Sequence, residues 1–405
     1  MNNWAGNFTY GTEALREGGS PEEVRDCIGS FERFKVLGTR HCFNDIADSK
    51  DQLVSLGSMN EIYGLDTRAQ TVAVEAGVRY GELAVWLESR GYALHNLASL
   101  PHISVAGGCA TATHGSGVGN GNLATAVRAM EFLDGTGRLV GVEGSEVEGV
   151  AVHLGALGVV TSITLAVEPS YTIRQTVYED LAMGALETDF DAIMSAGYSV
   201  SLFTNWRDQV INEVWVKRKE GGGPDFFGAK AADRDLHPIG ELSAGHCTIQ
   251  RDIPGPWHER LPHFKMGFTP SSGHELQSEY FVPREYSYAA VKAIGGLREW
   301  IAPLLMISEI RSVAADRLWM SPSYGRETTA FHFTWKRDWA GVREVLPMIE
   351  EKLAPFYVRP HWGKLFTMAP EKVQAQYEKL PAFRDLIRQY DPAGKFRNDF
   401  IARIC

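Results

Sequence analysis

The sequence predicts an α+β protein with two domains, and length and texture are the observations behind this prediction. Its 405 residues are enough for two hydrophobic cores. Up to about residue 170, short strand-like runs alternate with helical segments and glycine-rich turns, whereas longer alternating strands dominate after Tyr171. Such strands, interspersed with a few helices, are typical of an antiparallel sheet covered on one face. We expect a mixed α+β domain over residues 1–167 and a sheet-and-helix domain over 168–358. Pattern alone does not assign residues 359–405.

Composition excludes several classes of protein. Hydrophobic residues make up 44% and charged residues 22%, which are ordinary globular values. The net charge of −10 argues against binding to nucleic acid or to an anionic membrane, and the longest basic run, 217–219, is expected to end a strand in solvent. No signal peptide or membrane-spanning run is evident. The five cysteines are odd in number and lack CxxC spacing, so we expect no disulfide framework, no metal site and a cytoplasmic protein.

Helix and strand signals alternate through the first 167 residues. Ser20, Pro21 and Glu23 read as an N-cap, a first-turn proline and a capping-box glutamate, so a helix should run from residue 21 to about 31. A second helix is expected over 80–90, closed by Gly91. Strands are expected at 34–37, 71–75, 126–133, 138–142 and 159–167, with a hairpin turn at 134–137.

The second part of the chain is dominated by strand signals. Strands are expected at 199–206, 213–217, 277–282, 306–313 and 329–335. Helices are expected at 289–301, 340–353 and 370–390. Between the strands, residues 220–265 are irregular, with glycines, prolines and charges, and are predicted to form a long surface excursion.

The loop after the first predicted strand is rich in groups suited to a phosphate. Gly38 ends the strand, and Thr39, Arg40, His41 and Asn44 follow. A tight polar turn lines up backbone N–H groups in a concave nest, and the arginine adds a positive charge. A phosphate cradle needs no histidine, so His41 is the unusual residue. The alternative is a surface turn with an exposed histidine.

A run of small side chains occupies residues 104–117. It has neither a helical nor a strand-like amphipathic period, and it would let the backbone approach a large ligand and offer N–H and hydroxyl donors. The glycines at 115, 117, 119 and 121 do not form a dinucleotide fingerprint, because no strand precedes them and no helix follows in register. The alternative is a flexible loop.

Two predicted strands and one turn carry the remaining polar signals. Glu309 and Arg311 share one strand face, and His332 and Thr334 share another, so the two strands could line a hydrophilic pocket. The alternative is a solvent-facing side of a sheet. The stretch 359–364 places histidine, tryptophan, glycine and lysine after a rigid X-Pro turn, so it is dense in side chains that could take part in a site. The alternative is that this stretch is a charged turn between domains.

Together these segments resemble the vanillyl-alcohol-oxidase/p-cresol-methylhydroxylase (PCMH) flavoprotein superfamily, and within it the aldonolactone oxidase and alditol oxidase branch. The combination of 97–104 with 309–311 and 332–335 is the most specific part and resembles bacterial alditol oxidases. Thr39, Arg40 and Cys42 depart from that branch, where small residues are more frequent. The resemblance runs nearly end to end and rests on residues 3–7, 38–45, 99–117, 155–160, 309–311, 332–335, 361–364 and 391–396. It implies a PCMH-type FAD-binding domain, completed by residues 359–405, and an antiparallel-sheet-plus-helices substrate (cap) domain.

The resemblance implies FAD as the cofactor and His41 as its covalent anchor, through a ring nitrogen joined to the flavin 8α-methyl group. Val160 would pack at the adenine or ribose side and His361 near the flavin. Ala98 would lie at the reactive edge of the flavin, where its size could influence oxygen access. The implied cofactor-binding residues are Val36, Leu37, Gly38, Thr39, Arg40, His41, Ser99, Ser104, Gly107, Gly108, Cys109, Ala110, His114, Val160 and His361.

The resemblance also implies a polyol site. Hydride transfer from an alcohol carbon to flavin N5 requires removal of the O–H proton and stabilisation of the developing negative charge. Lys364, with His332 nearby, is the expected proton acceptor, and Arg311 the charge stabiliser. A lysine beside an arginine in a closed pocket should lose its proton more easily. The implied substrate-binding residues are Ser99, Glu309, Arg311, Thr334 and Lys364.

The implied function is oxidation of the terminal primary alcohol of a polyol such as xylitol or sorbitol to the aldose, with O2 reduced to hydrogen peroxide, by a monomer. One alternative is an aldonolactone oxidase or dehydrogenase on the same scaffold. The other is a carbohydrate-binding protein with an inert or absent flavin. Several hydroxyls held by exact hydrogen bonds favour an open-chain polyol.

Overall fold

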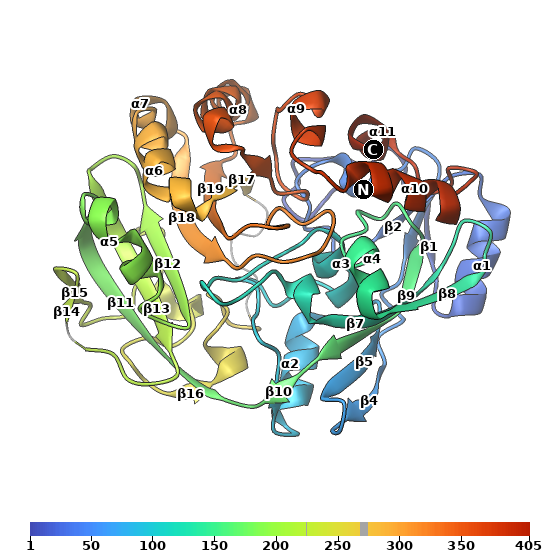
Figure 1. Ribbon diagram of the computed structural model, residues 1–405, viewed down its shortest axis with the longest axis horizontal. Coiled ribbons are helices and arrows are strands. Elements are labelled where there is room, and N and C mark those ends of the chain that lie inside the picture. Colours follow the sequence, from blue (N-terminus) through green and yellow to red (C-terminus); the bar gives the residue numbers. More distant parts are fainter. Residues whose placement is uncertain (224, 268–273) are drawn as a thin grey trace.

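A computed structural model describes residues 1–223, 225–267 and 274–405 (Figure 1). Within these residues, a ten-stranded antiparallel sheet occupies one side of the molecule, and sheets of five, three and two strands occupy the other. The predicted α+β class is therefore confirmed. The predicted domain limits stay a prediction. Residue 168 begins the short strand β10 (Glu168–Pro169), which directly precedes the first strand of the large sheet in the sequence. No helix of the described chain is long and apolar enough to span a bilayer.

The N-terminal side is built from two sheets. A three-stranded parallel sheet has the order β1-β3-β2, and a five-stranded antiparallel sheet has the order β4-β5-β9-β7-β8. The first comprises β1 (Leu15–Glu17), β2 (Lys35–Leu37) and β3 (Leu53–Ser55). The second comprises β4 (Ile62–Asp66), β5 (Thr71–Glu75), β7 (Val127–Leu133), β8 (Leu139–Glu143) and β9 (Val159–Ala166). β6 (Tyr92–Ala93) pairs with β10.

Four helices accompany these sheets. They are α1 (Pro21–Ser30), α2 (Tyr80–Glu88), α3 (Val105–Ala110) and α4 (Val147–Val150). The predicted cap of α1 is confirmed, because the Ser20 side chain accepts a hydrogen bond from the Glu23 backbone N–H at 3.2 Å. The alternative of a flexible loop for the small-residue run was wrong at α3. Ser104 caps this helix by accepting from the Gly107 N–H at 3.3 Å, so a polar cap begins a helix that has no amphipathic period.

The large sheet follows the path β14-β15-β11-β13-β12-β18-β19-β17-β20, with β16 pairing with β11. Its strands are β11 (Thr172–Ala182), β12 (Ser199–Thr204), β13 (Val210–Arg218), β14 (Asp225–Phe226), β15 (Ala229–Ala231), β16 (Gly255–Pro256), β17 (Glu275–Pro283), β18 (Leu305–Val313), β19 (Thr328–Lys336) and β20 (Arg359–Pro360). All five predicted strands of this part are confirmed. The eleven-residue β11 was missed by the sequence analysis.

One face of the large sheet packs on helices, as Figure 1 shows for α5 (Ala185–Met194), α6 (Ser287–Gly295) and α8 (Trp339–Leu353). Its core residues include Leu202, Ile310 and Phe333. The predicted single helix over 289–301 was wrong, because the chain divides it into α6 and α7 (Arg298–Ile301) around residues 295–297. Side chains alternate across a strand, so the opposite face carries the polar residues of β17, β18 and β19.

The segment 220–265 corrects a further prediction. Rather than a surface excursion, its described part packs on the polar side of the large sheet, where Leu236, Ile239 and Phe264 contact a small core that contains Trp215 and Ile307. Residue 224 of this segment lies outside the described residues. The backbone N–H of His263 donates to the Ser99 carbonyl at 3.2 Å, which joins the segment to the N-terminal side.

The C-terminal residues pack into the core of the N-terminal side. Helices α9 (Pro370–Gln374), α10 (Leu380–Tyr390) and α11 (Asp399–Ile404) contribute Val373, Phe383 and Phe400 to that core. The predicted helix 370–390 was wrong as a single element, because the chain breaks between Gln374 and Leu380 and Pro381 occupies the first turn of α10. Both chain termini lie near α10 and α11 in Figure 1.

Candidate active site

A cavity of about 760 Å³ lies between the N-terminal sheets and the polar face of the large sheet. With one exception, every predicted site residue lines it, from the His41 loop and the small-residue run to β18, β19 and the 361–364 turn. The exception is Cys109. Its side chain is fully buried with Sγ 3.4 Å from the Tyr80 hydroxyl, which leaves only its backbone to reach a cofactor.

Side-chain amides connect the 38–45 loop to remote segments through hydrogen bonds to backbone carbonyls. The Asn3 side chain donates to the Cys42 carbonyl at 2.9 Å, and the Asn7 side chain donates to the Phe43 carbonyl at 2.8 Å. The Asn44 side chain donates to the carbonyls of Trp362 and Lys364, both at 2.8 Å. Arg40 has a left-handed backbone (φ 62°), which gives the loop its sharp turn. The loop is therefore fixed against both the N-terminus and the 361–364 turn.

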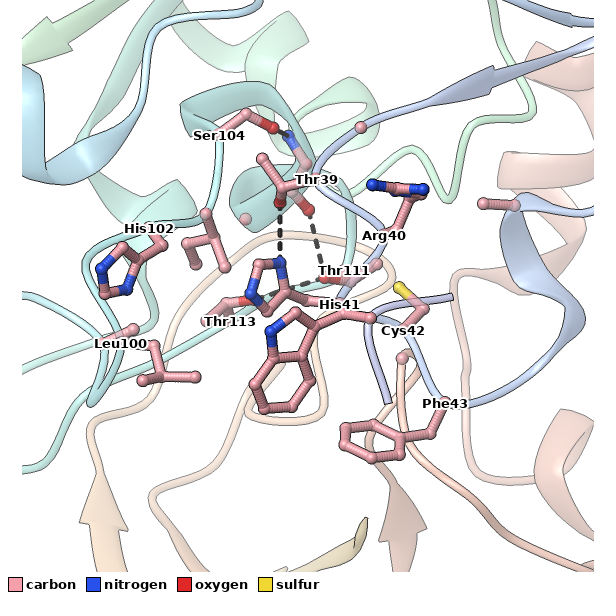
Figure 2. Close-up of a pocket in the computed structure, with 18 of the residues that line it drawn as sticks. Thr39, Arg40, His41, Cys42, Phe43, Leu100, His102, Ser104, Thr111 and Thr113 are labelled. Atoms are coloured by element: carbon pink, nitrogen blue, oxygen red, sulfur yellow. Dashed lines mark hydrogen bonds between the residues drawn. The ribbon is translucent and has the colours of Figure 1, made fainter. Parts of the chain in front are cut away.

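His41 is half-buried in the cavity wall rather than exposed on a surface turn. Its Nδ1 lies 3.0 Å from the Thr39 hydroxyl, a contact drawn in Figure 2, and its ring stacks on Trp4 with centroids 5.1 Å apart. Burial lowers the pKa of His41 to about 4, and the charge of Lys364 adds to this shift. At neutral pH the ring is therefore uncharged, and an uncharged imidazole nitrogen can act as a nucleophile.

The cavity fits a large planar cofactor with a phosphate-bearing tail. His41 Nε2 is buried without a hydrogen-bond partner among the described residues, so a polar ring atom is left for a ligand. Gly107 and Gly108 line the cavity without side chains, so the backbone can come close to a ligand. Thr39, Ser104, Thr111 and Thr113 supply hydroxyls around the same space (Figure 2). These features are compatible with FAD.

The polar face of the large sheet forms the other end of the cavity. In the register of the sheet, Glu279 of β17 lies opposite His332 of β19, which lies opposite Glu309 of β18. In the next row, Gln277 lies opposite Thr334. These side chains are nearly buried, so the alternative of a solvent-facing sheet was wrong. Their polar groups line the cavity and contact one another.

Glu279 is the centre of this network. One carboxylate oxygen lies 2.9 Å from Arg311 Nη2 and 3.1 Å from His114 Nε2, and the other lies 3.2 Å from His332 Nδ1. Burial opposes ionisation, but these three partners outweigh it and hold the pKa of Glu279 well below its usual range. Glu279 is therefore an anion at neutral pH, and it orients both Arg311 and His332.

The tautomer of His332 follows from its two partners. Nδ1 faces the ionised Glu279 carboxylate and carries the hydrogen, so Nε2 has a free lone pair, which lies 3.2 Å from the Thr334 hydroxyl. Burial lowers the pKa of His332, so the ring is neutral and its Nε2 can accept a proton from a bound hydroxyl.

Arg311 and Lys364 are the basic side chains at this end of the cavity. Arg311 Nη1 lies 3.3 Å from the Ser99 hydroxyl, and its Nε lies 3.5 Å from Glu309. The Lys364 ammonium donates to the Gln277 side chain, and its Nζ lies 4.9 Å from the Phe43 ring centroid. Burial is the main cause that lowers the pKa of Lys364, and Arg311 contributes in the same direction. This agrees with the predicted direction, although burial matters more than the arginine.

Sequence analysis missed several residues of this end. The polar alternation of Glu275, Gln277 and Glu279 is the same period-2 signal that identified the faces of the two neighbouring strands, and it could have found them. His263, whose Nε2 lies 2.7 Å from Glu309, was hidden inside the predicted surface excursion. No local pattern marks it, because its position depends on the packing of the whole 229–265 segment.

Comparisons with known proteins agree with this geometry. Over 407 aligned residues the chain is 46% identical to the alditol oxidase of a Streptomyces strain, which covers 99% of this chain and 98% of that protein. The chain belongs to the alditol oxidase family. In addition, residues 13–143 match a family model described as an FAD binding domain, and residues 272–404 match one described as D-arabinono-1,4-lactone oxidase.

More distant likenesses extend to lactone enzymes and to a steroid oxidase. The chain is 25% identical over 425 residues to the L-gulono-1,4-lactone dehydrogenase of Mycobacterium tuberculosis, which covers 99% of this chain and 98% of that protein. The crystal structure of cholesterol oxidase from B. sterolicum superposes with a TM-score of 0.78 and 15% identity, over 100% of this chain and 96% of that one. This last likeness shows the fold alone. The predicted FAD-binding flavoprotein fold is confirmed, and the chain is an FAD-dependent oxidoreductase of the alditol oxidase family.

Proposed function

We propose that this family member oxidises the terminal primary hydroxyl of an open-chain polyol such as xylitol or sorbitol to the aldose, with O2 reduced to hydrogen peroxide. The observation that supports this most directly is the row of polar side chains from β17, β18 and β19, which lines the same cavity as the His41 loop. A polyol offers a hydroxyl on each carbon, and such a row can hold several of them at once. The Streptomyces relative, by its name, acts on alditols.

FAD, when bound, supplies the two-electron acceptor for alcohol oxidation and passes the electrons on to O2. We propose that the predicted residues around His41 hold it, with the His41 ring nitrogen as the covalent anchor. Three features support a tether: the ring is neutral, one nitrogen has no partner among the described residues, and stacking on Trp4 fixes its plane.

In the proposed mechanism the protein moves the proton of the reacting hydroxyl. His332 Nε2 is a neutral acceptor whose tautomer Glu279 fixes, and Lys364, with its lowered pKa, is the second candidate acceptor. Arg311 lies between two carboxylates and stays charged, so it can stabilise the negative charge that develops on the substrate oxygen. Ser99, Glu309 and Thr334 would orient the remaining hydroxyls.

A substrate panel tests the proposal. Hydrogen peroxide formation should be measured with xylitol, sorbitol and glycerol, and in parallel with L-gulono-1,4-lactone and D-arabinono-1,4-lactone. We expect the highest kcat/KM with the five- and six-carbon polyols, and a lower value with glycerol because it offers fewer hydroxyls. A kcat/KM for either lactone above that for every polyol would overturn the substrate assignment.

An aldonolactone oxidase or dehydrogenase remains the second candidate. The match of residues 272–404 to the lactone oxidase model favours it. The polar row argues for the polyol, because a lactone is a ring with fewer free hydroxyls. The panel above distinguishes the two.

Acid precipitation tests the tether. Precipitated wild-type protein should stay yellow after washing, whereas His41→Ala should release its flavin into the supernatant. His274→Ala, which removes an exposed histidine, is the control and should precipitate yellow. A colourless wild-type precipitate would contradict the covalent bond without affecting the polyol proposal.

We further propose a monomeric enzyme of a reducing compartment. A single chain brings every predicted site residue except Cys109 to the same cavity, and the five cysteines are free. Light scattering after gel filtration should give a mass close to 44.8 kDa; a mass of twice that value would contradict the monomer.

A further inference from the structure

Lys217 is a buried cation outside the predicted site. The sequence analysis expected it at a strand end in solvent, but only 1% of its surface is exposed. It lies in β13, and its side chain extends from the polar face of the large sheet toward residues 261–263. A lysine is rarely buried to this extent unless its ammonium group is fully paired.

Three acceptors surround the Lys217 ammonium. Nζ donates to the Leu261 carbonyl, and it lies 3.2 Å from the Pro262 carbonyl and 3.1 Å from His263 Nδ1. A protonated lysine has three N–H donors, so each acceptor receives one. The carbonyls can only accept, and the third donor therefore meets the lone pair of His263 Nδ1.

This contact sets the direction of the next hydrogen bond. With its lone pair at Nδ1, the neutral His263 ring carries its hydrogen on Nε2, which lies 2.7 Å from Glu309 Oε1. Burial, together with the charge of Lys217, lowers the pKa of His263 to about 4 and keeps the ring neutral. The chain of donors thus runs from Lys217 through His263 to Glu309.

Aromatic packing fixes the His263 ring in this position. The ring meets Phe203 and Trp215 edge to face, with centroids 5.6 and 5.1 Å apart. Phe203 lies opposite Glu309 in the sheet register. The ring therefore has little freedom to turn away from the carboxylate.

We propose that Lys217 and His263 are positioning residues that hold Glu309 as an oriented anion. The Glu309 Oε1 atom accepts a hydrogen bond from His263, and the Oε2 atom is left to accept one from a hydroxyl of the polyol. No hydrogen bond from the described residues reaches Oε2. The inference rests on the proposed polyol oxidation and adds to it the residues that determine recognition of a hydroxyl away from the reacting carbon. Without the pair, Glu309 can turn toward Arg311, 3.5 Å away, and no longer present Oε2.

Substitution of His263 gives the main test. His263→Leu removes the donor to Glu309, whereas the amide of His263→Gln can still donate to it. We expect the KM for xylitol to rise about 10- to 100-fold in His263→Leu, the range for losing one hydrogen bond to a charged group, with kcat at saturation changed much less. His263→Gln should recover most of the loss. An unchanged KM in His263→Leu, or an equal loss in both variants, would overturn the proposal.

Lys217→Met removes the first donor of the series Lys217–His263–Glu309. Lys230→Met, at an exposed lysine, is its matched control. Lys217→Met should raise the KM for xylitol, and the control should not. Flavin content and thermal melting establish that each variant is folded; if Lys217→Met does not fold, the two His263 variants decide. If the wild-type enzyme itself fails to oxidise polyols, the proposed function fails, whereas normal wild-type activity with insensitive variants defeats only this inference.

A pH profile provides a readout that a purely structural role would not move. Burial lowers the pKa of Lys217 to about 7; Glu309 and Cys247 oppose this shift and Arg311 adds to it. Above that pH, neutral Lys217 keeps two donors for the carbonyls and can accept from Nδ1–H, so His263 Nε2 loses the hydrogen that Glu309 needs. The KM for xylitol should rise above pH 7 in the wild type, but not in His263→Gln. If the KM for xylitol changed with pH in the same way in the wild type and in His263→Gln, the proposed hydrogen-bond relay from Lys217 to Glu309 would be contradicted.

Discussion

The two ends of the cavity are built in different ways. Around His41, the side-chain amides of Asn3 and Asn7 bond the backbone of the loop, the Asn44 amide bonds the 361–364 turn, and the ring of His41 is neutral. On the large sheet, Glu279, Glu309 and Arg311 are buried ions that depend directly on one another. Loss of one contact at the first end leaves the others in place. Loss of one charge at the second end leaves a buried partner unpaired, which is costly.

This contrast assigns different tasks to the two ends. Under the proposed function, the His41 end holds the cofactor and requires a fixed shape that accommodates a large molecule, and backbone with small side chains provides it. The substrate end requires fixed charges and tautomers, which adjacent strands provide because the register fixes the spacing of their side chains. Substitutions on the sheet should therefore affect chemistry more than substitutions in the loop.

Lys364→Met should have the largest effect. It removes a candidate proton acceptor and the donor to Gln277, and we expect flavin reduction by xylitol to slow about 10³-fold, within the range for a lost acid–base group. Stopped-flow absorbance under anaerobic conditions measures this rate. Lys372→Met, at an exposed lysine of α9, should behave as wild type. Full activity of Lys364→Met would remove the role proposed for it.

Glu279→Gln should have the next largest effect. The amide keeps the size of the carboxylate but loses its charge, so His332 is no longer confined to one tautomer and Arg311 loses an ionic partner. We expect flavin reduction to slow about 10- to 100-fold, as for other residues that orient a reacting group. The exposed Glu371→Gln is the control. An unchanged rate would show that Glu279 does not set the state of His332.

His41→Ala should slow flavin reduction less than either sheet variant. The loop remains bonded through Asn3, Asn7 and Asn44, so bound FAD should keep its place without the tether. The rate is measured with excess FAD to keep the site filled. A loss larger than that of Lys364→Met would reverse the contrast between the two ends.

Ala98→Val should have the smallest effect on substrate oxidation. Ala98 is buried in the cavity wall, and its added methyl groups should restrict oxygen rather than the polyol. We expect slower reoxidation of the reduced enzyme by O2, with flavin reduction by xylitol almost unchanged. Mixing the reduced enzyme with oxygenated buffer measures the first rate. Equal slowing of both rates would place Ala98 at the substrate instead.

All predicted site residues except Cys109 line one cavity, because they lie in segments with local sequence signals. The N-cap at Ser20, the polar alternation of Glu309 and Arg311, and the loop around His41 can each be read from a few neighbouring residues. Lys217 and His263 could not be predicted in the same way. Their contact joins β13 to a segment whose sequence has no periodicity. Lys217 lies near the end of its strand, and it is buried only because that segment packs on the sheet.

Anaerobic mixing of the wild-type enzyme with xylitol tests the central claim most directly. We expect xylitol to bleach the oxidised flavin absorbance in a saturable reaction, and admission of O2 to restore the absorbance with formation of hydrogen peroxide. Flavin that stays oxidised with xylitol and sorbitol, but is bleached by an aldonolactone, would contradict it.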